Sequence, residues 1–143
     1  MRQASRIYLD ANVLIYLTEF DRDKTAALRA LIGDYQSTQA EFITSDLAYT
    51  EVLVRPIRAQ QVDLIQAYER LLTVFVKPLP VSRDVLCLAA KLRAGTPAQK
   101  TPDRTPDAIH VATAILAKAD VFVTGDKDIK NLPTTMTMKL VAA

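Results

Sequence analysis

The sequence is poor in the residue types that build several common kinds of site. Its one cysteine, Cys87, excludes an internal disulfide and fits a reducing cytosol. With only one histidine besides, the chain has no Cys/His cluster for zinc and no Ser-His-Asp set in a suitable context. Its three glycines form no glycine-rich phosphate loop. Chemistry based on these groups is therefore not expected.

Long apolar runs are also missing. No segment approaches the ~20 apolar residues that a membrane-spanning helix needs. Asp10 and Asn12 interrupt the apolar run near the N-terminus, and no small-residue cleavage site follows it. We therefore expect a cytoplasmic protein with no signal peptide and no association with a membrane.

What remains is the composition of an ordinary globular protein. The 143 residues are 50% hydrophobic and 24% charged, which predicts a single domain over residues 1–143 with one substantial core. The net charge of +2 comes from 18 Lys and Arg against 16 Asp and Glu. By itself this small excess indicates no particular partner.

Short apolar strands alternate with helical patterns along the chain, which predicts an α/β fold with a mostly parallel sheet. The expected strands are 6–10, 41–44, 74–81, 120–124 and 138–142. The expected helices are 12–17, 21–35, 46–54, 59–75, 82–95 and one that opens at Thr105-Pro106.

The helix boundaries follow from capping residues and prolines. We expect Asn12, Ser45 and Ser82 to act as N-caps, because Asn and Ser are preferred there. The pair Arg55-Pro56 is expected to end the 46–54 helix, because the residue before a proline is pushed out of helical geometry.

Acidic residues follow the predicted strands at places where a parallel sheet binds ligands. Asp10 follows the first strand, Glu51 lies in the helix after the second, and Asp126 follows the strand that ends at Thr124. Asp128 shares that turn but lies farther from the strand end. Each acid alone could be a turn, capping or surface residue, so the case depends on the group.

The stretch TPDRTPDAIHVATAI contains Thr-Pro-Asp twice. Asp107 lies in the first turn of an apolar helix, where the helix dipole favours an anion, whereas Asp103 lies in the preceding polar loop. Asp107 is therefore the better candidate for a site. His110, alone on an apolar helix, is expected to pack or to support the site rather than to catalyse.

Asp10, Glu51, Asp107 and Asp126 together predict a site for a hard cation. Carboxylates that lie close together repel one another unless a cation intervenes. An all-oxygen ligand set suits Mg²⁺ or Mn²⁺, which keep water molecules that a substrate phosphate can replace.

The motifs LDANVLIYL, Glu51 in its helix, TPDAIHVATAI and VFVTGDKDI together resemble a PIN domain, and most closely the VapC-type toxins of prokaryotic toxin–antitoxin pairs. The resemblance runs from about residue 6 to the end, although residues 55–100 match in pattern only. It implies a three-layer fold with a five-stranded sheet flanked by helices. It also implies a metal-dependent endoribonuclease that forms homodimers and is inhibited by a small antitoxin protein.

Carried over by position, Asp10, Glu51, Asp107 and Asp126 match the acidic catalytic and metal-binding residues of the family. Asn12 and Thr124 match its supporting polar positions, and Asp128 matches an accessory acid. Without the four acids, the chain has 18 basic against 12 acidic residues, a balance suited to binding the RNA backbone. The candidate phosphate contacts are Arg55, Arg58, Arg93, Lys100, Arg104 and Lys127.

Three other readings remain open at this point. A Mg²⁺-binding phosphoacceptor module also gathers aspartates at strand ends, but it needs a lysine at the end of a late strand, where this chain has Asp126. A PIN-like module could bind RNA or a partner without cutting. The chain could also be a stand-alone RNA-processing nuclease with no antitoxin.

Overall fold

The computed structural model describes residues 5–96, 104–129, 132, 134 and 136–142. Its centre is a five-stranded sheet in the order β3-β2-β1-β4-β5, in which every pair of neighbouring strands is parallel. The strands are β1 (Arg6–Leu9), β2 (Glu41–Ser45), β3 (Lys77–Leu79), β4 (Val121–Thr124) and β5 (Thr137–Leu140). The expected α/β fold with a five-stranded sheet is confirmed.

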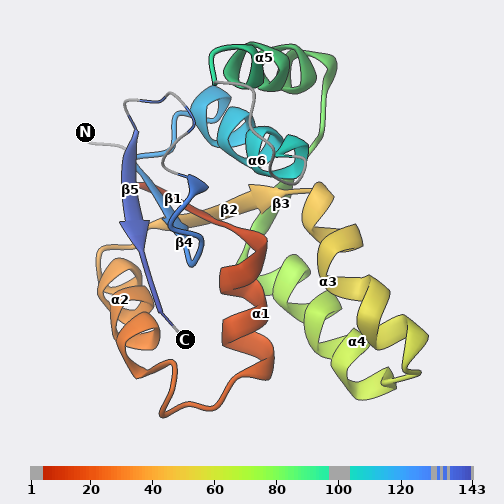
Figure 1. Cartoon of the computed structure of the whole chain (residues 1–143). Helices are drawn as coiled ribbons and strands as arrows, with labels where there is room; N and C mark the ends of the chain where they lie inside the picture. The colour runs from red at the N-terminus through yellow and green to blue at the C-terminus, as the bar shows by residue number, and fades with distance from the viewer. Residues whose placement is uncertain (1–4, 97–103, 130–131, 133, 135, 143) are drawn as a thin grey trace.

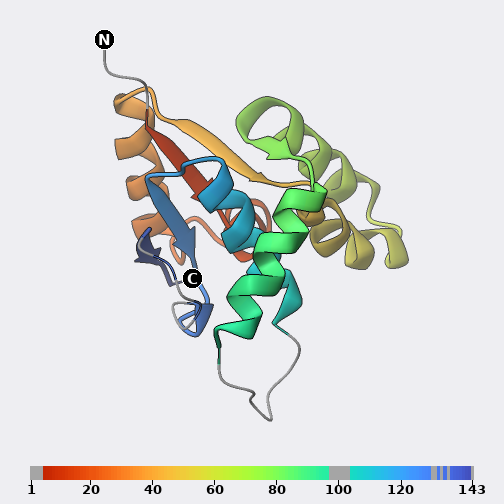
Figure 2. The ribbon, with the colours of Figure 1, turned by 90° about the horizontal axis from the view of Figure 1, so that it is seen from above.

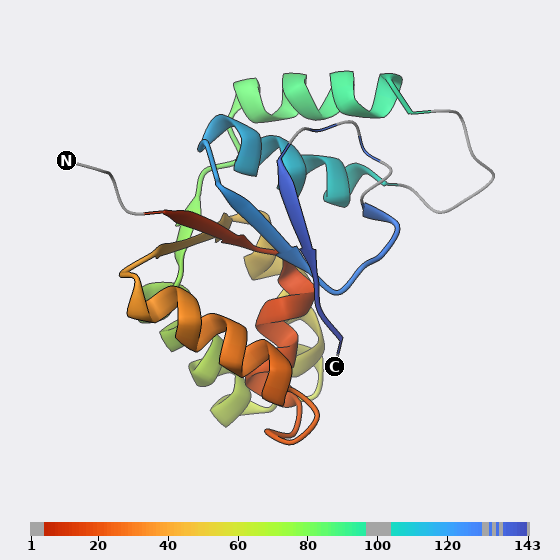
Figure 3. The ribbon, with the colours of Figure 1, turned by 90° about the vertical axis from the view of Figure 1, so that its left-hand side faces the viewer.

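Helices cover both faces of the sheet (Figures 1 and 3). One layer holds α1 (Ala11–Glu19), α2 (Ala26–Ser37), α3 (Leu47–Arg58), α4 (Val62–Arg70) and the short π-helix η1 (Leu71–Phe75). The other holds α5 (Arg83–Ala94) and α6 (Thr105–Leu116), which cross each other on the viewer's side of the strands in Figure 2. The three layers agree with the sequence expectation.

The alternation of side chains along β1 explains why both faces are covered. Ile7 and Leu9 pack into the core with α1 to α4, whereas Tyr8 between them packs with α5 and α6. A strand whose residues are apolar on both sides can be buried only between two layers. Tyr8 also stacks on Phe122 of the neighbouring β4, with ring centroids 4.9 Å apart.

Two of the predicted N-caps need correction. The first helix begins at Ala11, and its N-cap is Asp10 rather than Asn12, because an Asp10 oxygen accepts a hydrogen bond from the Ala11 N–H. Ser45 ends β2, one residue before the N-cap position of α3, although its hydroxyl still accepts from the Leu47 N–H. Ser82 caps α5 as predicted by accepting from the Val85 N–H.

The prediction that Arg55-Pro56 ends a helix is wrong. Pro56 is buried inside α3, which continues to Arg58. The proline lies in the last turn, so it removes one backbone hydrogen bond near an end that would fray in any case. Burial of its ring against the core then favours the helical path over an early stop.

Two other element boundaries differ from the prediction. The strand expected over 74–81 is reduced to Lys77–Leu79, because Val74 and Phe75 continue α4 through the π-helical turn closed by Val76 N–H to Leu71 O. The helix expected from residue 21 begins at Ala26. There the Thr25 hydroxyl bonds the Asp21 carbonyl and so stabilises a turn before the helix.

The sheet order places a reversal of direction between β1 and β4. From β1 the chain adds β2 and then β3 on one side, and it returns to add β4 and β5 on the other. Ligands of parallel sheets bind at the carboxyl ends of the strands beside such a reversal. Asp10 and Thr124 lie at that point of this sheet.

Among the described residues, no helix has the length and apolar character needed to cross a bilayer.

Candidate active site

Asp10 is the buried centre of the carboxyl edge. Asp10 is 4% exposed. One of its carboxylate oxygens accepts a hydrogen bond of 2.8 Å from the Ala11 N–H. The other accepts the Thr124 hydroxyl at 2.8 Å and a longer bond, 3.4 Å, from the Asn12 amide. Burial raises the pKa of Asp10 despite the opposing effects of His110 and these hydrogen bonds, and Asp107 raises it further.

Asn12 and Thr124 connect Asp10 to the turn after β4. The Asn12 carbonyl accepts the Gly125 N–H at 3.0 Å, and the Thr124 hydroxyl accepts the Asp126 N–H at 3.1 Å. These hydrogen bonds hold the residues that follow β1 next to those that follow β4, at the point where the strand order reverses. The structure brings both predicted supporting residues to Asp10.

His110 and Tyr8 support the site from the core below it. His110 is 1% exposed, and its Nε2 lies 2.6 Å from a Glu51 oxygen and 3.8 Å from an Asp10 oxygen. Its Nδ1 lies 2.6 Å from the Tyr8 hydroxyl. The single Nε2–H hydrogen-bonds Glu51, and Asp10 lies within ion-pair distance of the same nitrogen, so His110 fixes where Glu51 lies relative to Asp10.

The environment of His110 favours its charged form. Burial lowers the pKa of His110, but the hydrogen bond to Glu51 and the charges of Asp10, Glu51 and Asp107 outweigh it, so the pKa is raised. Burial and the nearby Asp10 charge raise the pKa of Tyr8 well above its usual value, which keeps the phenol protonated. The sequence anticipated a supporting role for His110, but it gave no signal for Tyr8.

Asp107, Asp126 and Asp128 converge on one arginine. A terminal nitrogen of Arg104, Nη1, lies 2.8 Å from Asp107 and 3.1 Å from Asp126, and Nη2 lies 3.4 Å from Asp128. The Asp128 N–H also bonds a carboxylate oxygen of Asp126. The hydrogen bond to Asp107 and the neighbouring carboxylates raise the pKa of Arg104. This pairing was not predicted from the sequence.

The predicted phosphate contacts lie at different places. Arg55 and Arg58 are in the last turn of α3, and Lys127 follows β4 beside Asp126. Arg93 donates to the Thr105 hydroxyl at 2.8 Å and so links α5 to the start of α6. Arg104 pairs with the acids as described. Lys100 and the loop residue Asp103 lie outside the described residues.

The donor set fits a hard divalent ion in its chemistry, because it consists of carboxylate, amide and hydroxyl oxygens. Its arrangement in this conformation is not a complete ion site. Within the described part of the chain, no three Asp, Glu, His or Cys side chains converge as ligands of one metal ion. The Arg104 guanidinium lies where Asp107 and Asp126 face each other.

Comparison with known proteins supplies the family. The sequence model of the PIN domain matches residues 7–134, most of the chain. The chain belongs to the PIN domain family. In this PIN protein the acids described above therefore lie on the fold that the sequence resemblance implied. A comparison with curated proteins found no match.

Solved structures with the same fold include toxin–antitoxin complexes. VapBC2 from Rickettsia felis, bound to a promoter DNA fragment, has a TM-score of 0.70 at 14% identity and covers 94% of this chain and 98% of its own. A toxin–antitoxin complex from Klebsiella pneumoniae has a TM-score of 0.59 at 24% identity, with 89% and 92% covered. FitAcB from Neisseria gonorrhoeae has a TM-score of 0.53 at 16% identity, with 93% and 96% covered.

Proposed function

We propose that this PIN protein is a Mg²⁺- or Mn²⁺-dependent endoribonuclease and the toxin of a toxin–antitoxin pair. The observation that carries the proposal is the carboxyl edge of the sheet. There the Thr124 hydroxyl donates to the Asp10 carboxylate and accepts from the backbone N–H of Asp126, and the carboxylates of Asp107 and Asp126 both contact the Arg104 guanidinium. Family membership and the fold of the toxin–antitoxin complexes add support.

Asp10, Glu51, Asp107 and Asp126 would hold the ion. An ion bound by these acids would activate water and stabilise charge on the phosphate of RNA. The chain's own residues supply the support: Asn12 and Thr124 orient Asp10, and His110 orients Glu51. Asp128 would act as an accessory acid.

Basic residues near this edge would position the RNA backbone. Lys127 lies in the same turn as Asp126, and Arg93 lies beside the start of α6. The proposed set also includes Arg104 at this edge, Arg55 and Arg58 in the last turn of α3, and Lys100, which lies outside the described residues. Such contacts strengthen binding to any sequence and weaken as salt concentration rises.

The direct test is cleavage of labelled RNA by the purified protein with Mg²⁺, with Mn²⁺ and with EDTA. We expect cleavage with either ion and none with EDTA. A DNA strand of the same sequence tests the preference for RNA, and Asp107→Asn excludes a contaminating nuclease. Cleavage that survives EDTA, or that Asp107→Asn retains in full, would contradict the proposal.

A second candidate function is binding of RNA or a partner without cleavage. One observation favours it: the Arg104 guanidinium lies between the acids that an ion would need. RNA binding in a gel-shift assay with no product under any metal condition would support this alternative.

We also propose an antitoxin partner and a homodimer. Apolar side chains are exposed on the α3–α4 pair, where Val54, Ile57 and Val62 are 38%, 56% and 60% exposed. Exposed apolar groups on adjoining helices suit a protein partner.

For the homodimer, light scattering of the purified protein should give twice the mass of one chain. Co-expression with a short neighbouring reading frame should yield a complex in which RNA cleavage is suppressed. A monomer, or a protein that no neighbouring product binds, would contradict these two parts.

A further inference from the structure

One guanidinium group in this site contacts three carboxylates from two separated segments. Arg104 precedes α6 and pairs with Asp107 one helical turn later, and it reaches Asp126 and Asp128 in the turn after β4. Both Asp107 and Asp126 direct an oxygen at the same nitrogen, Nη1, at 2.8 and 3.1 Å. They therefore already converge on a point of positive charge.

Arg104 occupies the point on which these acids converge, and the described residues include no complete set of metal ligands there. Asp107 and Asp126 face each other, yet no three acidic, His or Cys side chains of the described residues form an ion site. The point toward which their oxygens turn is filled by a nitrogen of Arg104. A divalent cation and a guanidinium repel each other at such short range, so one must leave when the other binds.

We propose that Arg104 is a built-in competitor of the divalent ion. Its single positive charge offsets part of the negative charge of Asp107, Asp126 and Asp128, and it must turn away before an ion can use those carboxylates. The inference rests on the proposed metal-dependent function. It predicts that Arg104 weakens ion binding, whereas a residue that only organised the acids would strengthen it.

The partial exposure of these groups makes such an exchange feasible. The side chains of Arg104, Asp107 and Asp126 are 30%, 24% and 31% exposed, and that of Asp128 is 52% exposed. Ion pairs at this exposure contribute little each, because water screens them. A divalent ion can therefore displace the arginine, while three pairs together still alter its affinity measurably.

The test is isothermal titration of Mn²⁺ into the full-length protein without RNA. Compared with wild type, Arg104→Gln should bind Mn²⁺ about tenfold more tightly, the change expected when several modest ion pairs no longer compete. Arg104→Lys keeps the charge but loses the planar fork that reaches several carboxylates, so its affinity should lie between the two.

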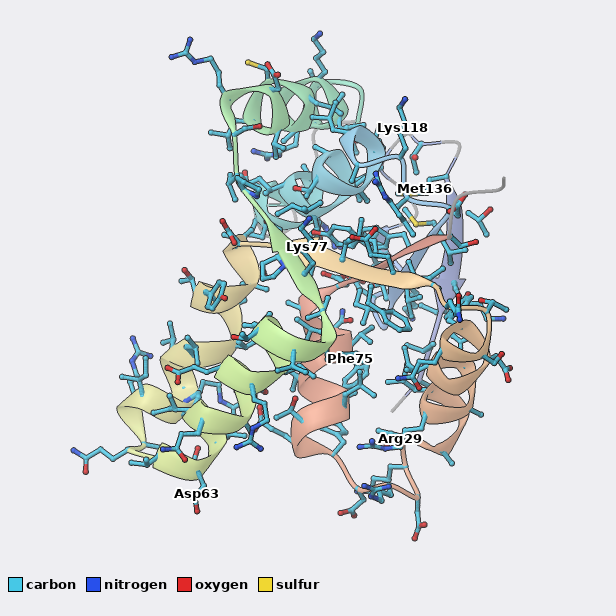
Figure 4. All side chains as sticks on the ribbon, turned by 180° about the vertical axis from the view of Figure 1, so that it is seen from behind. Arg29, Asp63, Phe75, Lys77, Lys118 and Met136 are labelled. Atoms are coloured by element: carbon cyan, nitrogen blue, oxygen red, sulfur yellow. The ribbon has the colours of Figure 1, made fainter. Side chains whose placement is uncertain are left out.

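Lys118→Gln is the matched control for loss of one positive charge. Lys118 follows the last turn of α6, at the opposite end of the helix from Arg104, and extends from the surface in Figure 4. Exposed charges separated by more than ~10 Å are largely screened at 0.1 M salt, so its Mn²⁺ affinity should stay within about twofold of wild type.

A thermal melt guards against a folding defect in Arg104→Gln. Without Mn²⁺ this variant should melt below wild type, because its acids repel one another unopposed. Saturating Mn²⁺ should raise its melting temperature by more than it raises that of wild type. The two readouts do not depend on RNA cleavage.

The outcomes separate this inference from the proposed function. Equal or weaker Mn²⁺ binding by Arg104→Gln, with wild type binding normally and Asp107→Asn binding less, would overturn the role of Arg104 and leave the metal site standing. Absence of Mn²⁺ binding in every protein would overturn both.

Discussion

The two halves of the acidic edge accommodate negative charge in different ways. Asp10 is buried, and its partners are a backbone N–H, a threonine hydroxyl, an amide and the imidazole of His110. Asp107 and Asp126 are partly exposed and share one arginine. The buried half is fixed by short hydrogen bonds, whereas the exposed half is held by a cation that can be exchanged.

This difference indicates which half is preformed. Every buried side-chain nitrogen and oxygen of the described residues has a hydrogen-bond partner, so Asp10 has little freedom to move. The ion pairs of Arg104 involve flexible, solvated side chains. We therefore expect substitutions in the two halves to affect cleavage equally but stability unequally.

The largest expected effect is loss of cleavage. Asp10→Asn and Asp107→Asn should each lower the rate of RNA cleavage by at least about a hundredfold, because each removes a charged ligand of the proposed ion. Single-turnover rates on a labelled RNA would measure this, with Asp34→Asn in α2 as a control that keeps the wild-type rate. Full activity in either variant would show that its acid does not serve the site.

Gly125→Ala should lower both stability and cleavage, by less than the loss of cleavage expected for the acid substitutions. A Cβ at this position would lie 2.4 Å from the Tyr16 hydroxyl oxygen, so Tyr16 or the turn must move. We expect a loss of roughly 1–3 kcal/mol in the free energy of unfolding, as for other overpacked sites. Cleavage should also fall, because the Gly125 N–H bonds Asn12 and Asp126 is the next residue.

Urea unfolding and cleavage rates test this together. Gly33→Ala is the control, because a Cβ there meets no atom within 4 Å. It should leave both quantities near wild type or raise stability slightly. A fully stable and active Gly125→Ala would mean that the turn after β4 is not held in place by Tyr16.

The two halves should differ in stability without metal. Because burial raises the pKa of Asp10, its contribution to stability is present below the ordinary carboxyl pKa and is lost as pH rises through the raised value. At pH 7 Asp10→Asn should therefore unfold at an equal or higher temperature than wild type, by roughly 4 °C for each kcal/mol regained. Its advantage should shrink as pH falls toward 4.

Asp107→Asn offers the contrast in the same melts with EDTA present. It removes one partner of a partly exposed arginine, so its melting temperature at pH 7 should change by no more than about 2 °C. A marked loss of stability in Asp10→Asn at pH 7 would contradict the conclusion that burial makes the charged form of Asp10 unfavourable.

The smallest effect is expected for Asp103→Ala. Sequence analysis places Asp103 in a basic loop and Asp107 in a helix, and the structure confirms Asp107 in the first turn of α6. Asp103→Ala should retain near-normal turnover, with RNA binding unchanged or slightly tighter at low salt and no difference at moderate salt. Equal losses in Asp103→Ala and Asp107→Ala would mean that both acids serve the ion.

The sequence predicted the fold because its local signals agree with its tertiary structure. Apolar strands alternate with amphipathic helices, and in a parallel sheet this order is enough to bring Asp10 and Thr124 to one edge. Local rules failed at some element ends, as at Pro56, for which the rule predicted a helix end. There, packing of the proline in the last turn of α3 outweighed the local preference.

The partners within the site could not be read from the sequence. Arg104 reaches Asp126 over 22 positions and His110 reaches Glu51 over 59, and neither spacing has a local signature. The N-cap Asp10 likewise bonds the hydroxyl of Thr124, which arrives from another strand. Sequence analysis identified the acids, but the contacts that separate a buried half from an exchangeable half required the fold.

The central claim is that the acids of both halves form one divalent-ion site. A crystal structure of the protein soaked in Mn²⁺, with anomalous diffraction to locate the ion, tests it most directly. The account predicts a manganese peak among Asp10, Glu51, Asp107 and Asp126, with Arg104 turned away from the carboxylates. A map with no peak at this edge, and with Arg104 still spanning Asp107 and Asp126, would contradict it.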